Sequence, residues 1–264
     1  MPELPEVESA RAVLEEHALH RRIVAIDEVD SYVCRPFSTE DFRSALLHIE
    51  FTAALRQGKA LWLTTNGRAD LGLHLGMGGR LVVTDATGAV VDGGDSTHGR
   101  AGAHQARWDR FVVHFNDGAL RLADKRRFGR AVLDPNHAVL GLDAMAITLA
   151  EFRAALGSSA SPIKARLLNQ SVVAGIGNLL ADETLWRARI APARPTHSLT
   201  ASETATLHRC MRSAVRYTTR HGGSHTGHIV PYRQPDARCP RCGTEMSHTR
   251  LGGRSTWWCP AEQT

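Results

Sequence analysis

The sequence changes from a β-type pattern to a helical pattern near Pro135. From residue 22 to about residue 133, short apolar runs are separated by turn signals, including Asn66-Gly67 and Asn116-Asp117-Gly118. Residues 93–105, rich in Gly, His and Ser, are predicted to form a loop. Several short strands with few helices predict a β-sandwich or a barrel for this half of the chain.

The second half is predicted to be helical. Helices are expected at 150–156, at 163–168, at 179–186 and after the capping box Thr200-x-x-Glu203. A cysteine-bearing hairpin is expected to follow. The predicted division is 1–134 for the β domain, 135–149 for a linker, 150–230 for the helical domain and 231–264 for the hairpin.

The charge balance indicates a polyanionic partner. The 264 residues carry a formal net charge of +5 with a pI near 9.2, which is typical of nucleic-acid-binding proteins. No apolar run approaches the roughly 20 residues of a membrane helix. The acidic, proline-containing start does not resemble a secretory signal. We therefore expect a cytoplasmic protein with no membrane partner.

Three of the five cysteines lie together at the end of the chain. Cys239, Cys242 and Cys259 have the spacing of two knuckles that hold one structural Zn²⁺. The fourth expected position is occupied by Glu262, whose carboxylate can bind zinc. His248, inside the hairpin, is the rival ligand. The alternative is a degenerate knuckle that holds metal weakly or not at all.

The first residues carry a candidate nucleophile. If Met1 is removed, Pro2 presents a secondary amine, and an α-amino group titrates near pH ~8, so much of it is unprotonated at neutral pH. Glu3 supplies a neighbouring carboxylate. A helix is predicted over 5–19, so that Pro2 and Glu3 would lie just before its start.

Four glycine-containing segments carry further candidates. Gly175-Ile176-Gly177-Asn178 could be an ordinary glycine turn between two helices, or could leave N–H groups exposed at a helix start, where an anion can bind. The glycine-rich turn after His74 projects Met77, which could wedge into a base stack or simply fill the core. Arg126-Arg127-Phe128 could form a solvated charged turn, or could instead bind phosphate and stack on a base. Gln57-Gly58-Lys59 offers one cation in another turn.

Taken in order, these motifs resemble the bacterial formamidopyrimidine-DNA glycosylase/endonuclease VIII family of base-excision repair enzymes. The resemblance extends nearly from end to end. It implies an α+β fold, with an N-terminal two-layer β-sandwich and flanking helices, followed by a helix–two-turn–helix domain and a zinc-finger β-hairpin. It also implies a monomer that acts on damaged DNA, expected in duplex form, in the bacterial cytosol or nucleoid.

The resemblance assigns roles to matching residues. Pro2 would attack the sugar of a nucleotide flipped out of the helix, Glu3 would serve as acid/base, and Lys59 would lie beside the lesion. The implied DNA-binding residues are Glu6, His74, Met77, Arg126, Arg127, Phe128, Lys164, Asn178 and Arg254. The activity implied is that of a bifunctional DNA glycosylase and abasic-site lyase, which breaks the strand by β- and δ-elimination.

The chain also departs from the family pattern. Glu262 replaces the usual last cysteine, Asn169 stands where aspartate is frequent, and Leu180 stands where an aromatic residue is common. The stretch from Gly223 to Arg238 is shorter than the loop that caps a flipped 8-oxoguanine. We therefore leave the preferred lesion open.

Two other functions are alternatives to this one. A protein on the same scaffold could bind lesions or abasic sites without excising bases, but it would gain nothing from holding both Pro2 and Glu3. An unrelated zinc-ribbon nucleic-acid protein would leave the first 130 residues unexplained.

Overall fold

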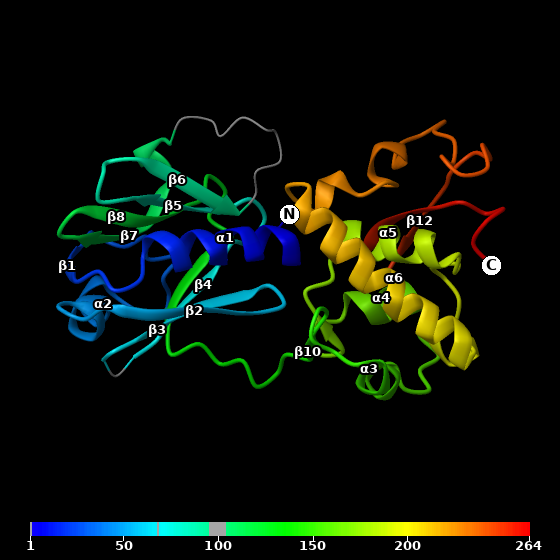
Figure 1. Cartoon of the computed structure of the whole chain (residues 1–264), viewed down its shortest axis with the longest axis horizontal. Helices are drawn as coiled ribbons and strands as arrows, with labels where there is room; N and C mark the ends of the chain where they lie inside the picture. Colours follow the sequence, from blue (N-terminus) through cyan, green and yellow to red (C-terminus); the bar gives the residue numbers. More distant parts are fainter. Residues whose placement is uncertain (1, 68, 95–103) are drawn as a thin grey trace. The chain divides into compact units, whose positions relative to one another are not determined.

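A computed structural model describes residues 2–67, 69–94 and 104–264 (Figure 1). The chain divides into two compact units. The first contains residues 1–2 and Glu6–Ala138, and the second contains Glu3–Pro5 and Val139–Thr264. Each unit is described by itself.

The first unit contains two antiparallel sheets. The five-stranded sheet has the order β1–β7–β8–β5–β6, and the four-stranded sheet has the order β2–β3–β4–β9. The strands are β1 (Ile23–Ile26), β2 (Phe51–Gln57), β3 (Ala60–Thr65), β4 (Leu71–His74), β5 (Arg80–Thr84), β6 (Val90–Gly94), β7 (Asp109–Phe115), β8 (Gly118–Ala123) and β9 (Arg130–Leu133).

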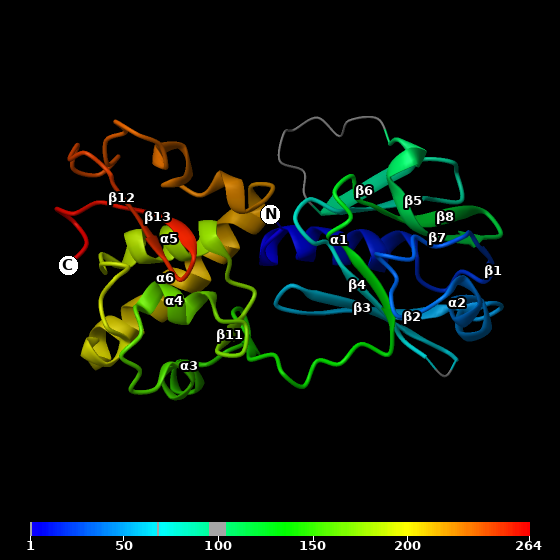
Figure 2. The ribbon, with the colours of Figure 1, turned by 180° about the vertical axis from the view of Figure 1, so that it is seen from behind.

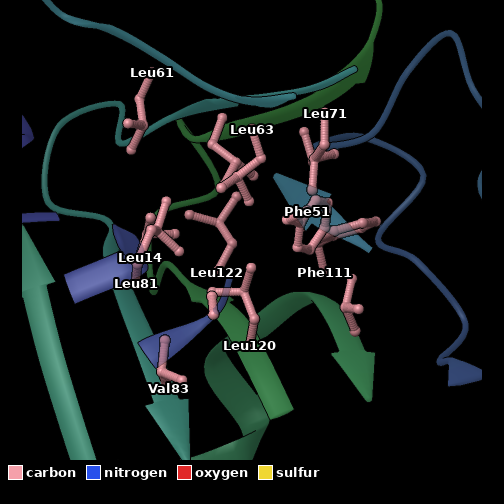
Figure 3. Packing of buried hydrophobic residues seen from close by; sticks show 14 of the residues in the cluster. Leu14, Phe51, Leu61, Leu63, Leu71, Leu81, Val83, Phe111, Leu120 and Leu122 are labelled. Atoms are coloured by element: carbon pink, nitrogen blue, oxygen red, sulfur yellow. The ribbon is translucent and has the colours of Figure 1, made fainter. Parts of the chain in front are cut away.

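Both sheets contribute to a single hydrophobic core. Leu61, Leu63 and Leu71 come from the four-stranded sheet, and Leu81 and Leu122 come from the five-stranded sheet (Figure 3). Helices α1 (Leu4–His17) and α2 (Thr39–Leu46) pack against the same core. This arrangement confirms the predicted two-layer sandwich with flanking helices.

The turns of this unit agree with the sequence in part. Asn116 and Asp117 form the two-residue connection between β7 and β8, as predicted. Asn66 and Gly67 lie in the longer connection between β3 and β4. Most of the predicted loop, 95–103, lies outside the described residues. Its first two residues, Gly93 and Gly94, belong to β6 instead.

The second unit is helical, as predicted. Its helices are α3 (Leu149–Leu156), α4 (Ile163–Leu168), α5 (Asn178–Ala188) and α6 (Ala201–Arg220), with a short 3-10 turn at Thr196–Ser198. Strands β10 (Leu142–Asp143) and β11 (Val173–Ala174) pair in parallel. The predicted capping box at the start of α6 is present.

The chain ends in a hairpin packed on α5. Strands β12 (Ser247–Leu251) and β13 (Arg254–Trp258) are joined by Gly252 and Gly253, whose φ angles of 55° and 72° glycine adopts without strain. The hairpin lies beside α5 (Figure 2), and a small hydrophobic core joins the two. Its buried members are Trp186, Ile229, Cys239, Met246, Trp257 and Cys259.

Short 3-10 turns at Ser224–Thr226 and Val230–Tyr232 fill the stretch between α6 and the hairpin. Among the described residues, no helix has both the length and the apolar character that crossing a membrane requires.

Candidate functional site

Lys59 lies in a tight turn of the first unit. Gln57 and Ala60 are paired residues of β2 and β3, so Gly58 and Lys59 form a two-residue connection. Gly58 has a φ angle of 60°, which glycine adopts without strain. The turn therefore presents the Lys59 side chain at the end of the hairpin, and the residue is half-buried.

His74 ends strand β4, where it is paired with Arg130 of β9. The backbone N–H of Gly76 donates to His74 Nδ1 at 3.0 Å, so the neutral ring carries its proton on Nε2. Desolvation lowers the pKa of His74, and the charges of Lys59 and Arg130 lower it further. His74 is thus a neutral hydrogen-bond donor at neutral pH, suited to a phosphate oxygen.

The turns that carry Met77 and Phe128 are in backbone contact. Gly76 has a φ angle of 58°, and a Cβ atom at this position would lie 2.4 Å from the carbonyl carbon of Phe128. Both apolar side chains are exposed, Met77 by 39% and Phe128 by 50%. The Arg126 guanidinium lies 6.0 Å from the Phe128 ring centroid. The structure therefore brings the three residues predicted to fill a vacated base position onto two touching turns.

Asp124, which was not predicted as a site residue, stabilises the second of these turns. Its buried carboxylate accepts the backbone N–H groups of Arg126 at 2.9 Å and Gly129 at 2.6 Å. An aspartate two residues before a turn donor is a recognisable Asx-turn signal. Asp124 thus fixes the backbone from which Arg126 and Phe128 project.

The Arg127 side chain binds Asp30, whereas the neighbouring Arg126 side chain lies beside the Phe128 ring. Arg127 adopts a φ angle of 60°, and its guanidinium donates to Asp30 Oδ1 at 2.7 Å. Desolvation opposes ionisation of Asp30, yet hydrogen bonds from Arg127 and from backbone N–H groups leave the pKa of the carboxyl below its ordinary value. The predicted contact of Arg127 with DNA stays a prediction.

In the second unit, the Glu3 carboxylate caps helix α5. It accepts backbone N–H groups of Gly177 at 3.1 Å, Leu179 at 2.8 Å and Leu180 at 3.0 Å. Helix α5 has no capping side chain of its own, because its N-cap residue is glycine. Glu3, which is 1% exposed, supplies that cap from the N-terminal segment of the chain.

Gly177 makes this approach possible. A Cβ atom on Gly177 would lie 2.3 Å from Glu3 Cδ, closer than any real contact. Asn178, the first residue of α5, has a buried Oδ1 with no hydrogen-bond partner among the described residues. The start of α5 thus combines an anchored carboxylate with an amide, both predicted as site residues.

Lys164 lies in the interior of the second unit. Its ammonium group is 2.6 Å from Asp182 Oδ1 and donates to Thr256 Oγ1 at 2.8 Å and to the Ser255 carbonyl at 3.0 Å. The Lys164 side chain is fully buried. This geometry favours a structural ion pair, and it does not favour the predicted DNA contact.

Arg254 is exposed at the first position of β13, next to the glycine turn. It is paired across the hairpin with Leu251. The position leaves its guanidinium accessible, as a contact with a phosphate requires.

The three C-terminal cysteines gather in one place. Their sulfur atoms all lie within 4.8 Å of one another, and Sγ of Cys242 is 3.4 Å from Sγ of Cys259. Trp186 donates its indole N–H to the Cys239 sulfur at 3.5 Å. Three sulfur donors at this separation suit a zinc ion, which these residues would hold as a structural metal. Neither Glu262 nor His248 belongs to this group of ligand atoms.

Pro2 and Glu6 belong to the first unit, and both are buried. Met1 precedes Pro2 in the chain, so the Pro2 nitrogen is part of a peptide bond. The proline becomes a secondary amine only after Met1 is removed.

The sandwich, the helices around the Gly177 turn and the cysteine hairpin together define a class of enzyme. They are the parts of a DNA glycosylase that acts on damaged bases and also cleaves DNA at abasic sites. Three family models match consecutive parts of the chain: the formamidopyrimidine-DNA glycosylase N-terminal domain over residues 1–131, the H2TH domain of the same enzymes over 140–228, and the zinc finger found in FPG and IleRS over 238–261. The chain belongs to the formamidopyrimidine-DNA glycosylase family.

Individual relatives agree with this assignment. The formamidopyrimidine-DNA glycosylase of a Roseiflexus species is 33% identical over 284 residues, covering 98% of each chain. A complex of the Lactococcus lactis Fpg with abasic-site DNA has a TM-score of 0.82 at 27% identity, over 99% of both chains. Another complex of that protein, with DNA containing an oxidised pyrimidine, has a TM-score of 0.82 at 28% identity over 100% of both chains. The predicted family, fold and zinc-finger character are confirmed.

Proposed function

We propose that Pro2, freed by removal of Met1, is the nucleophile with which this glycosylase excises damaged bases. The observation that carries the proposal is the anchoring of Glu3. Three backbone N–H groups at the start of α5 hold its carboxylate. Because Glu3 is covalently joined to Pro2, this anchor also limits where the Pro2 nitrogen can lie, and such positioning lowers the barrier for attack.

The chemistry follows from the amine. The Pro2 nitrogen forms a bond to C1′ of the damaged nucleotide, the glycosidic bond breaks, and the base leaves with its bonding electrons and takes up a proton. The nitrogen loses its own proton, the C1′–O4′ bond breaks, and O4′ takes up a proton to become a hydroxyl, so that the nitrogen lone pair completes an iminium. This iminium acidifies the C2′ proton. Loss of that proton expels the 3′ phosphate by β-elimination, and a second elimination expels the 5′ phosphate. Glu3 is the proposed carrier of these protons, and Glu6 is a supporting carboxylate.

The DNA would be held by residues from both units. Lys59 and His74 are proposed to bind phosphates beside the lesion, as are Asn178 and Arg254. Met77, Arg126 and Phe128 are proposed to occupy the space that the flipped nucleotide leaves. Exposed apolar groups next to a guanidinium support that role, because they can replace lost stacking and face the unpaired base.

The segment between α6 and the hairpin bears on the preferred lesion. It is short, and Glu183 of α5 holds it by accepting the Ile229 N–H at 2.8 Å. Arg233 of the same segment pairs with Asp182 at 3.0 Å. A segment held against α5 in this way is a poor cap for 8-oxoguanine. We therefore propose a preference for oxidised pyrimidines, ring-opened or further-oxidised purines, or bulky adducts.

A panel of duplexes with single lesions tests this preference. We expect faster excision of oxidised pyrimidines and ring-opened purines than of 8-oxoguanine paired with cytosine. Strong selectivity for 8-oxoguanine opposite cytosine would contradict the proposal.

Borohydride trapping on abasic-site DNA tests the nucleophile. We expect a covalent adduct with the mature protein and none with Pro2→Gly. The matched control is protein that retains Met1, verified by intact mass, which keeps every side chain but blocks the amine. An untrappable complex of mature protein that still binds abasic DNA tightly would favour the non-excising binder.

The same proposal extends to the setting of the reaction. We propose that the protein acts as a monomer on duplex DNA in the bacterial cytosol.

The boundaries near residues 134, 149 and 230 remain the proposed division into domains.

A further inference from the structure

The metal-binding cysteines differ in their access to solvent. Cys239 and Cys259 are buried, whereas Cys242 is exposed. A metal ion held by all three sulfurs would therefore have one side toward the protein interior and one side toward solvent. Zinc prefers four ligands, so the identity of the fourth decides whether the site is closed.

Glu262 has other partners. Its Oε2 atom accepts from Arg241 Nη1 at 3.0 Å and lies 3.4 Å from Arg189 Nε. Arg241 is itself held in place, because it donates to the Trp186 carbonyl at 3.0 Å and lies 4.0 Å from the Trp186 ring. To reach the cysteines, the Glu262 carboxylate would have to leave two guanidinium groups.

His248 is also engaged elsewhere. Its Nε2 atom is 2.9 Å from Ser255 Oγ, and its ring stacks on Trp257 with centroids 4.5 Å apart. Both contacts lie within the β12–β13 hairpin. The imidazole would have to give up the stacking and the hydrogen bond to bind the metal.

Charge balance also disfavours Glu262 as the fourth zinc ligand. Three thiolates on a dication carry one net negative charge, and a carboxylate would add a second. In the present arrangement the Glu262 charge is instead balanced by Arg241 and Arg189. The carboxylate therefore serves the knuckle as an ion-pair partner of an arginine inside the Cys239–Cys242 turn.

We propose that the zinc site of this protein has three protein ligands, Cys239, Cys242 and Cys259, and that an exchangeable ligand from solution takes the fourth position. The site is then open to small donors such as imidazole or a small thiol. This inference goes beyond the glycosylase activity and does not depend on it.

Cobalt substitution in the full-length protein tests the open position. Co²⁺ reports its ligands through visible absorption. We expect added imidazole to shift the spectrum of the wild-type protein with saturation. In Glu262→Cys, a fourth thiolate should abolish the shift and tighten metal binding about tenfold or more.

Two substitutions test whether Glu262 or His248 is the fourth zinc ligand. Glu262→Gln should leave both the cobalt spectrum and the zinc content as in the wild type, since it alters only the ion pairs with the arginines. His248→Ala should do the same. Loss of zinc with a changed spectrum in either variant would overturn the proposal, as would a wild-type spectrum that does not respond to imidazole. Because none of these readouts is catalytic, failure of the glycosylase proposal would not affect them.

Discussion

At the scale of single residues, the site depends on one glycine that lies beside one carboxylate. Gly177 leaves room for the Glu3 side chain, and its own N–H is one of the three that the carboxylate accepts. A glycine before a helix is commonly explained by backbone freedom. Here the φ angle of Gly177 is −116°, which any residue can adopt, so the requirement is for space.

Gly177→Ala should therefore impair chemistry more than folding. The added methyl group would overlap Glu3 Cδ, so the carboxylate must leave the start of α5. We expect a loss of about 1–3 kcal/mol in unfolding free energy from the displaced packing. Borohydride trapping should slow by about tenfold or more, since misplacement of a reacting group is costly.

Gly67→Ala provides the matched control. Its Cβ would lie 3.1 Å from two methyl groups of the Ile49 side chain, and no Glu3 atom is among its three nearest neighbours. Trapping by this variant should be as fast as in the wild type. Wild-type trapping by Gly177→Ala would show that the position of Glu3 is irrelevant to the reaction.

At the scale of elements, helix α5 organises the second unit. Its start receives Glu3, its Asp182 pairs with Lys164 and Arg233, and its Glu183 holds the segment before the hairpin. Both acidic residues are buried. Charged groups this deep are stable only when paired, so the helix fixes the positions of its partners.

Lys164→Met tests whether the buried lysine is structural. Removing the ammonium leaves Asp182 Oδ1 without its ion-pair partner, and we expect a loss of about 3 kcal/mol in unfolding free energy. The salt dependence of DNA affinity should not change. A weaker salt dependence of DNA affinity, with an unchanged free energy of unfolding, would instead favour a contact between Lys164 and DNA.

Helix α6 provides a pH-dependent test. Hydrogen bonds from Arg194 and from the Thr200 N–H lower the pKa of Glu203 from 4.5 to about 2. The native state therefore binds fewer protons than the unfolded state between these values. The stabilisation is complete above pH 4.5 and is lost as the pH falls through 2.

Glu203→Gln should remove this contribution. Because 33% of the Glu203 side chain is exposed, screening limits the loss at pH 7 to about 1 kcal/mol or less. Thermal unfolding of both proteins from pH 7 to pH 2 measures the difference, which should shrink below pH 4.5 and vanish near pH 2. A difference that is independent of pH would contradict the assigned cause.

The elements also show what local patterns can and cannot predict. The capping box at Thr200 and the two-residue turn at Asn116 were predicted because their signals are local. Helix α2 was not predicted, although Ser38 and Asp41 form a capping box of the same kind. The helix has only eight residues, and it lies between segments with a strand-like pattern.

At the scale of the whole molecule, the order of motifs predicted the fold and the family, and contacts between distant segments were not predictable. The capping of α5 by Glu3 joins residues 174 or more positions apart. The pairing of Lys164 with Asp182 in the interior could not be predicted either, because charge alone does not reveal burial. The chemistry of a motif can thus be predicted from residue types, but the partner of each side chain depends on the tertiary structure.

The net charge of +5 leads to the last prediction. DNA affinity should fall steeply with salt, because each phosphate contact releases counterions, with a slope of about −0.9 per contact. Arg254→Gln should reduce the magnitude of that slope by about one contact if its guanidinium binds a phosphate. Arg22→Gln removes the same charge from an exposed position in the first unit, so that each variant has a net charge of +4. If the slope has the same magnitude in both variants, Arg254 contributes only general charge. A slope of smaller magnitude in Arg254→Gln alone would identify a phosphate contact at the tip of the hairpin.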